Sequence, residues 1–274
     1  MKIFYYVLIV FVFSACSIST EEDTTDYGTS DGTASAPVEL TVGTAKSGGI
    51  AYNGYSYYKF TTSATGAGNY KFAIASMTVT DGWSSYAVYT SLYSDSGLTS
   101  SSKLDSESCA ASCTLYFDYE NLDASKSYYL KLSAYGTITY SLTVSKGNSE
   151  GSKNNPVELT LGTAHSGTID NIDANWDNGY SYYKFTTASA DNHTLTMNNS
   201  DSLDCSLYSN SGFSSSVSSY YNDCTAGTTL SKTFTGTSSS VGLLSGTSYY
   251  LRIEGTSSTL KTTTYNITVA AEGN

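Results

Sequence analysis

The sequence predicts an all-β protein made of two tandem antiparallel β-sandwiches, each with about seven to nine strands. Short segments in which apolar and polar residues alternate are separated by Gly, Ser, Asn and Asp, and long stretches with helical periodicity are absent. Strands with a single apolar face must pair those faces, and two packed sheets achieve this in a domain of about 110 residues. The strand pattern also occurs twice, which predicts two such domains.

The clearest repeated segment is Gly-Tyr-Ser-Tyr-Tyr-Lys-Phe-Thr-Thr, found at Gly54–Thr62 and again at Gly179–Thr187. Its alternation predicts a strand with two different faces. Tyr58 and Phe60 share one face with Thr62, and we expect this face to lie in the core.

The repeat extends over most of the chain. Pro-Val-Glu-Leu begins at Pro37 and again at Pro156, which is 156 − 37 = 119 residues later, and further matching segments keep the same order. A repeat of this length is a duplicated domain and not a solenoid unit. We therefore expect domains at 37–146 (repeat 1) and 153–271 (repeat 2), joined by a short polar linker at 147–152.

The order of these segments resembles the bacterial pre-peptidase C-terminal domain, whose relatives include the collagen-binding domains of collagenases. Both repeats carry the Pro-Val-Glu-Leu, Tyr-Tyr-Lys-Phe, Ser-Leu-Tyr-Ser and Tyr-Tyr-Leu segments in that order. The resemblance implies jelly-roll-like sandwiches that are not catalytic and usually accompany secreted enzymes. One departure from the family is Ala51-Tyr52-Asn53, where relatives have an acidic signature.

The first residues predict a lipoprotein signal peptide at 1–15. Lys2 supplies a positive charge, and the apolar run Ile3–Phe13 has 11 residues, too few to span a bilayer as a helix. The following Ser-Ala-Cys resembles a bacterial lipobox, which implies cleavage before Cys16 and a lipid on that cysteine. Phe13 departs from the usual Leu, and an ordinary secretory signal with a chance cysteine is the alternative.

Residues 16–36 are mostly Ser, Thr, Glu, Asp and Gly. Such a segment buries too little apolar surface to fold and predicts a flexible tether. Ser17 stands where enteric lipoproteins retained in the inner membrane have Asp. We therefore expect an exported, lipid-anchored protein at the outer membrane or cell surface of a bacterium.

Charge and motif content narrow the function classes. The net charge of −11 disfavours nucleic acid as a partner. The two histidines, His165 and His193, lack a catalytic motif around them, and the sequence has no nucleophile elbow or P-loop. We expect no enzymatic activity, although a hydrolase with unmarked paired carboxylates remains an alternative.

The chain has 26 tyrosines, and those expected at the surface are the feature that most suggests a binding role. Strand parity points six of them away from the core: Tyr57, Tyr93, Tyr129, Tyr182, Tyr208 and Tyr250. Tyrosine suits contact with sugars or proteins, which predicts a binding or adhesion module with a glycan or protein ligand. The alternative is cross-strand packing in a structural or accessory lipoprotein that has no dedicated ligand.

Four cysteines remain besides Cys16, two in each repeat, and an exported compartment permits disulfides. Separate domains favour the pairs Cys109–Cys113 and Cys205–Cys224. Reduced, buried cysteines are the alternative.

A calcium site is expected in repeat 2 only. The segment from Asp170 to Asn178 carries the carboxylates of Asp170, Asp173 and Asp177 together with several Asn amides, and calcium prefers such oxygen ligands. The family resemblance adds the linker residues Glu150 and Asn154 to the ligand set. A solvated Asp/Asn turn without metal is the alternative.

Overall fold

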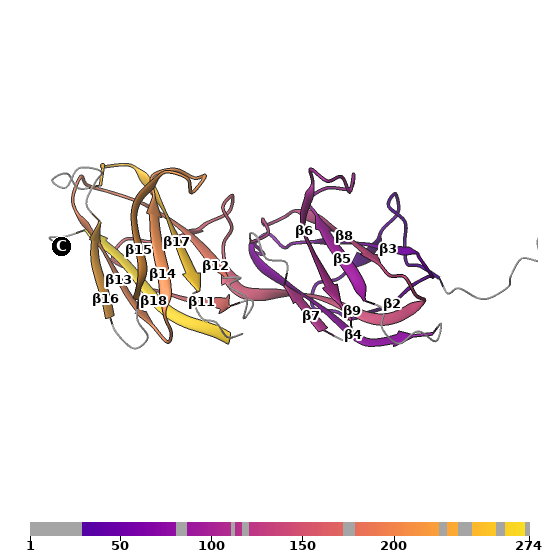
Figure 1. Cartoon of the computed structure of the whole chain (residues 1–274). Helices are drawn as coiled ribbons and strands as arrows, with labels where there is room; N and C mark the ends of the chain where they lie inside the picture. Colours follow the sequence, from indigo (N-terminus) through magenta and orange to yellow (C-terminus); the bar gives the residue numbers. More distant parts are fainter. Residues whose placement is uncertain are drawn as a thin grey trace, which may run out of the picture.

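The structure, a computed structural model, describes residues 29–80, 87–110, 113–116, 121–171, 179–224, 229–234, 243–255 and 261–271. It confirms the all-β class, and its regular elements in these ranges are strands (Figure 1). None of the residues that the structure describes belongs to a helix able to cross a bilayer. Strands β1 to β9 come from repeat 1 and β10 to β18 from repeat 2.

Repeat 1 forms two sheets whose apolar faces meet. The first has the strand order β1 (Val38–Leu40), β3 (Tyr55–Thr61), β8 (Ser127–Ser133), β5 (Val88–Tyr93) and β6 (Lys103–Cys109). The second has the order β2 (Lys46–Ile50), β9 (Ile138–Glu150), β4 (Gly68–Val79) and β7 (Cys113–Tyr116).

Repeat 2 reproduces this arrangement strand for strand. One sheet has the order β10 (Val157–Glu158), β12 (Tyr180–Thr186), β17 (Ser248–Gly255), β14 (Leu203–Tyr208) and β15 (Ser216–Cys224). The other has the order β11 (His165–Asn171), β18 (Lys261–Ala271), β13 (His193–Asn199) and β16 (Thr229–Phe234).

One detail departs from the expected antiparallel pairing. β1 pairs with β3 in parallel, and β10 pairs with β12 in the same way. In each repeat the intervening strand, β2 or β11, belongs to the opposite sheet. The chain therefore crosses over and returns in its original direction, which a parallel pair requires.

The predicted inward faces are buried. Tyr58 and Phe60 of β3, like Tyr183 and Phe185 of β12, are fully excluded from solvent. Apolar residues of the two sheets of repeat 1 form one core cluster, and those of repeat 2 form another. Strand alternation thus fixes which residues fill each core, while the division into two separate domains stays a prediction.

The first repeat begins earlier than the expected boundary at residue 37. The backbone amide of Asp31 donates to the Ser56 hydroxyl at 2.9 Å, and Tyr57 N donates to the Asp31 carbonyl at 2.7 Å. Residues 29–36 therefore belong with repeat 1 and not with a flexible tether. Residues 16–28 lie outside the described residues.

Residues 147–152 were expected to form a polar linker, but they are part of the packed structure. β9 continues to Glu150, and the side chains of Ser149 and Ser152 are fully buried. The Asn121 amide donates to the carbonyls of Gly151 and Tyr180, both at 2.6 Å. The junction is thus packed against both repeats, because its backbone groups find partners on each side.

Candidate binding site

The outer face of the sheet β1-β3-β8-β5-β6 carries two widely spaced tyrosines. The strand register places Tyr55 of β3 and Tyr89 of β5 on either side of Ser133 of β8. Adjacent strands are about 4.8 Å apart, so the two tyrosines are separated by roughly 10 Å across the sheet. Tyr55 is 48% exposed and Tyr89 is 47% exposed. The small side chain of Ser133 leaves the space between the two rings open.

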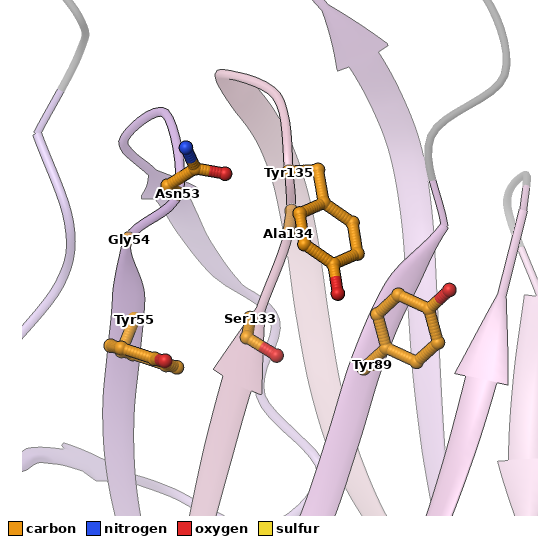
Figure 2. Close-up of a pocket in the computed structure, with 7 residues that line it drawn as sticks. All are labelled: Asn53, Gly54, Tyr55, Tyr89, Ser133, Ala134 and Tyr135. Carbon is orange, nitrogen blue, oxygen red and sulfur yellow. The ribbon is translucent and has the colours of Figure 1, made fainter.

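A cleft of about 440 Å³ occupies this end of the sheet (Figure 2). We call it the tyrosine cleft, and it is lined by Asn53, Gly54, Tyr55, Tyr89, Ser133, Ala134 and Tyr135. Its volume lies within the range of about 300–1,000 Å³ that is typical of small-molecule sites. Aromatic rings, an amide and a hydroxyl are its principal chemical groups.

Two turns complete the cleft. Asn53 lies in the β2–β3 turn with φ of 51°, a left-handed conformation that Asn tolerates better than most residues. Gly54 follows, and a Cβ atom there would lie 2.8 Å from the Ala51 carbonyl oxygen. Tyr135, which follows β8, is 62% exposed, and its ring meets that of Tyr89 edge to face at 6.0 Å between centroids.

A positive charge lies beside the cleft. Lys131 of β8 is two residues before Ser133, so both side chains share the outer face. The ammonium nitrogen of Lys131 is 4.0 Å from the centroid of the Tyr55 ring. This cation–π contact favours one orientation of the Tyr55 ring and brings the cation close to the cleft.

The cation on the matching face of repeat 2 has an acidic partner within the repeat. Glu254 stands at the place of Ser133, and Asp204 stands at the place of Tyr89. Arg252, the counterpart of Lys131, forms an ion pair with Glu254 at 3.2 Å. Its guanidinium group also lies 5.2 Å from the centroid of the Tyr180 ring.

An aromatic residue covers the remainder of that face. Phe213, from the β14–β15 turn, packs edge to face against Tyr182, Tyr208 and Tyr250, with centroid distances of 4.9, 5.4 and 5.6 Å. Repeat 1 has the smaller Leu98 at the corresponding place. Among the described residues, the two copies therefore share a backbone plan but carry different side chains on this face.

The six tyrosines expected on the surface fall into two groups. Tyr93, Tyr182 and Tyr208 are buried, so the expectation of exposed rings is wrong for these three. Tyr57, Tyr129 and Tyr250 are half-buried. Cross-strand packing accounts for this burial, since the register sets Tyr93 opposite Tyr129 and Tyr208 opposite Tyr250. Parity determines the face of a residue but not its exposure.

Sequence analysis missed the three tyrosines that line the cleft. Tyr55 and Tyr89 have the same outward parity as the predicted set, but Tyr135 lies in a turn, where alternation carries no information. A comparison of the two copies could have pointed to Tyr89, because repeat 2 has Asp204 at the corresponding position.

Asp170, an expected calcium ligand, lies instead at the junction of the two repeats. Its carboxylate pairs with Lys71 at 3.1 Å and accepts hydrogen bonds from Asn69, Asn148 and Thr262. Burial alone would raise the pKa of Asp170, but the bonds from Asn148, Thr262 and Asn69 outweigh it and lower the pKa to about 2. A cation at this carboxylate would compete with those donors.

The other expected calcium ligands are not brought together with Asp170. Glu150 accepts hydrogen bonds from Tyr183 at 3.0 Å and contacts His165 at 2.7 Å, whereas the Asn154 amide donates to Asp123 at 2.9 Å. Within the described ranges, no three acidic, His or Cys side chains form a group suited to a metal ion. Asp173 and Asp177 lie outside the described residues, so the calcium site stays a prediction.

The cysteine predictions have different outcomes. The Cys109–Cys113 disulfide is confirmed, and it connects the end of β6 in one sheet to the start of β7 in the other. Cys205 is buried with its sulfur 3.9 Å from that of Met197. The Cys224 side chain and all of Cys16 lie outside the described residues. Cys205 forms no disulfide in the structure, so the predicted Cys205–Cys224 bridge is wrong. The strand register explains this, because it sets Tyr220 opposite Cys205 and places Cys224 opposite Leu203. Lipidation at Cys16 stays a prediction.

Comparison with known proteins does not assign the chain to a family. No protein-family model and no curated protein sequence matches it. Among solved structures it is similar to tripeptidyl peptidase 2, at 7% identity over 85% of this chain with a TM-score of 0.31, although it spans only 24% of that protein. It is also similar to the PBSX exported protein XepA, at 9% identity over 84% of this chain and 88% of the other, with a TM-score of 0.23. Both scores are too low to support an argument about function.

Proposed function

We propose that this protein is an exported, lipid-anchored, non-catalytic binding module, and that its ligand binds in the tyrosine cleft of repeat 1. The leader and Ser-Ala-Cys16 pattern support export and lipidation. The cleft supports binding, because exposed aromatic rings beside an amide and a hydroxyl suit a glycan or an extracellular protein.

The observation that carries the proposal is the contrast between the two copies. In repeat 1, Tyr55, Tyr89 and Tyr135 remain exposed around open space. At the described positions of repeat 2 that correspond to the cleft, Asp204 and Glu254 replace Tyr89 and Ser133, and Glu254 forms an ion pair with Arg252. Large exposed aromatic groups are unfavourable in water, so their concentration at one site favours a role in binding.

Binding can be tested on an array of glycans and extracellular matrix proteins with residues 17–274, which include every described residue. We expect binding that Tyr89→Ala and Tyr135→Ala each weaken by about tenfold, as expected for truncation of a central aromatic contact. Tyr180→Ala, at the repeat 2 counterpart of Tyr55, is the matched control and should bind as the parent does. Binding that all three variants retain would place the ligand elsewhere.

Absence of binding to the whole array would favour the alternative, an accessory lipoprotein without a dedicated ligand. Lipid attachment has its own test, which is intact-mass analysis of protein extracted from its native membrane. We expect a mature chain that begins at an acylated Cys16. An unmodified Cys16 or a different first residue would contradict the anchor.

A further inference from the structure

We infer that the ligand of the tyrosine cleft is an acidic polysaccharide, with one of its carboxylates bound by Lys131. The net charge of −11 that disfavours nucleic acid belongs to the chain as a whole, whereas the row of the sheet beside the cleft carries a positive charge. This inference rests on the proposed function and specifies the class of ligand. It starts from the charged side chains around the cleft and from their counterparts in repeat 2.

Lys131 is a cation with neutral neighbours on its own row of the sheet. The register sets it between Tyr57 of β3 and Ser91 of β5, with Ser106 of β6 beyond. Among the residues that the structure describes, no carboxylate forms an ion pair with Lys131. By contrast, Lys59 on the next row pairs with Glu39 at 3.0 Å. The charge of Lys131 is thus available to a ligand.

Repeat 2 indicates where the anion of such a ligand would lie. There Glu254 takes the place of Ser133, and its carboxylate is 3.2 Å from the guanidinium group of Arg252, the counterpart of Lys131. Repeat 1 keeps the cation but has a small hydroxyl in place of the acid. A ligand carboxylate above Ser133 would therefore reproduce in repeat 1 the pairing that repeat 2 makes internally.

The remaining groups favour sugar rings as the carriers of that carboxylate. Tyr55, Tyr89 and Tyr135 offer aromatic surfaces to the apolar faces of pyranose rings, and Asn53 and Ser133 can bond to hydroxyl groups. A second depression, lined by Tyr89, Ser91, Lys103, Ser106, Glu107 and others, adjoins the cleft at Tyr89. Adjoining hollows along one sheet face fit a chain of several sugars better than a single monosaccharide.

The inference can be tested with the full chain in non-ionic detergent. The probes are polygalacturonate, alginate and hyaluronan, each compared with its carboxyl-reduced form by biolayer interferometry. We expect binding to at least one acidic polymer and a loss of about tenfold or more after carboxyl reduction, which is the usual worth of a charge-assisted hydrogen bond. Lys131→Met should cause a similar loss for the acidic polymer and no further loss for its reduced form.

Lys59→Met is the matched control, because the same change is made at a lysine that already has a partner, and it should leave binding unchanged. Lys131→Arg should retain binding, and equal melting temperatures of all variants will exclude a folding defect. Binding that is equal for the acidic and reduced forms but is lost in Tyr89→Ala would overturn the acidic ligand and keep the proposed function. If the parent chain binds neither form of any polymer, the acidic-polysaccharide inference is wrong. The protein and glycan array then decides the proposed function separately.

Discussion

The hydroxyl group of Tyr58 donates a hydrogen bond of 2.6 Å to the carboxylate of Asp31, which joins the start of repeat 1 to its core. The same hydroxyl lies 2.7 Å from that of Tyr140 in the opposite sheet. Repeat 2 repeats the arrangement with Tyr183 and Glu150, where the hydrogen bond is 3.0 Å. Each repeat thus closes over a pair of buried tyrosines with an acid from the segment that precedes it.

Replacement of Tyr58 by Phe should destabilise the protein by about 2 kcal/mol, since a hydrogen bond to a charged acceptor is lost. Tyr129→Phe is the control, because its ring is half-exposed, and it should cost less than about 0.5 kcal/mol. Urea unfolding of the two variants and the parent measures both values. Equal effects would show that the bond to Asp31 contributes little.

Buried tyrosines should make the protein sensitive to alkali. Burial raises the pKa of Tyr70 and of Tyr128 from 10.0 to about 12. A raised pKa in the folded state gives stability that is complete below about pH 10 and is lost as the pH rises toward 12. We therefore expect the urea midpoint to fall over this interval, with ultraviolet absorbance reporting ionisation. A midpoint that stays constant up to about pH 12 would contradict the burial effect.

Asp170 should make the protein sensitive to acid. Its pKa falls from 3.8 to about 2 on folding, so its contribution is present above pH 3.8 and is lost as the pH falls through about 2. This pKa shift corresponds to a contribution of about 2 kcal/mol to the free energy of unfolding at neutral pH. Asp170→Asn should remove this stability and also leave Lys71 without its acidic partner.

The measurement for Asp170 is urea unfolding at neutral pH and at acid pH. Asp95→Asn is a suitable control, because Asp95 is exposed and its carboxylate accepts a hydrogen bond from Gly97 N in a turn. The parent and the control should lose stability in parallel as the pH falls, whereas Asp170→Asn should lose less. A parallel loss in all three proteins would exclude Asp170 as the responsible group.

Loss of the Cys109–Cys113 disulfide should weaken repeat 1. Replacement of Cys109 and Cys113 by Ala should destabilise repeat 1 by about 2 kcal/mol in the chain-entropy model. Non-reducing peptide mapping should recover Cys109 joined to Cys113 and should recover Cys205 in a peptide without a disulfide. A peptide that joins Cys113 to a cysteine of repeat 2 would contradict the Cys109–Cys113 assignment.

Calcium can be tested by differential scanning calorimetry, with calcium and with chelator. A bound ion raises the melting temperature by mass action, so the proposed site in repeat 2 predicts a higher melting temperature in calcium. Because the Asp170 carboxylate already has several donors, Asp173 and Asp177 are the main candidates for ligands. Their joint replacement by Ala should abolish the shift, and identical melts of the parent chain would refute the site.

Much of the fold followed from alternation alone. Tyr58 and Phe60 were assigned to the core because a strand directs alternate residues to one side, and both are fully buried. The candidate site did not follow in the same way. Tyr55 and Tyr89 meet around Ser133 only through cross-strand register, which depends on contacts between segments distant in sequence. Tyr135 joins them from a turn that has no periodic signal.

The segment boundaries were missed for a different reason. Composition suggested that residues 16–36 could not fold, but Asp31 in this segment forms hydrogen bonds with Ser56, Tyr57 and Tyr58 of repeat 1. Asp31-Gly32 precedes Pro37 by the same spacing as Glu150-Gly151 precedes Pro156. Gly32 and Gly151 also share a left-handed conformation, with φ of 63° and 66°. A search for short polar matches, beside the apolar ones, would have placed both boundaries correctly.

Because Glu150 is both the last residue of β9 and the acid that caps the tyrosine pair of repeat 2, the two units overlap by one residue. Each sandwich is completed by an acid that precedes its first strand, Asp31 in repeat 1 and Glu150 in repeat 2, so the unit that repeats begins several residues before the sandwich itself.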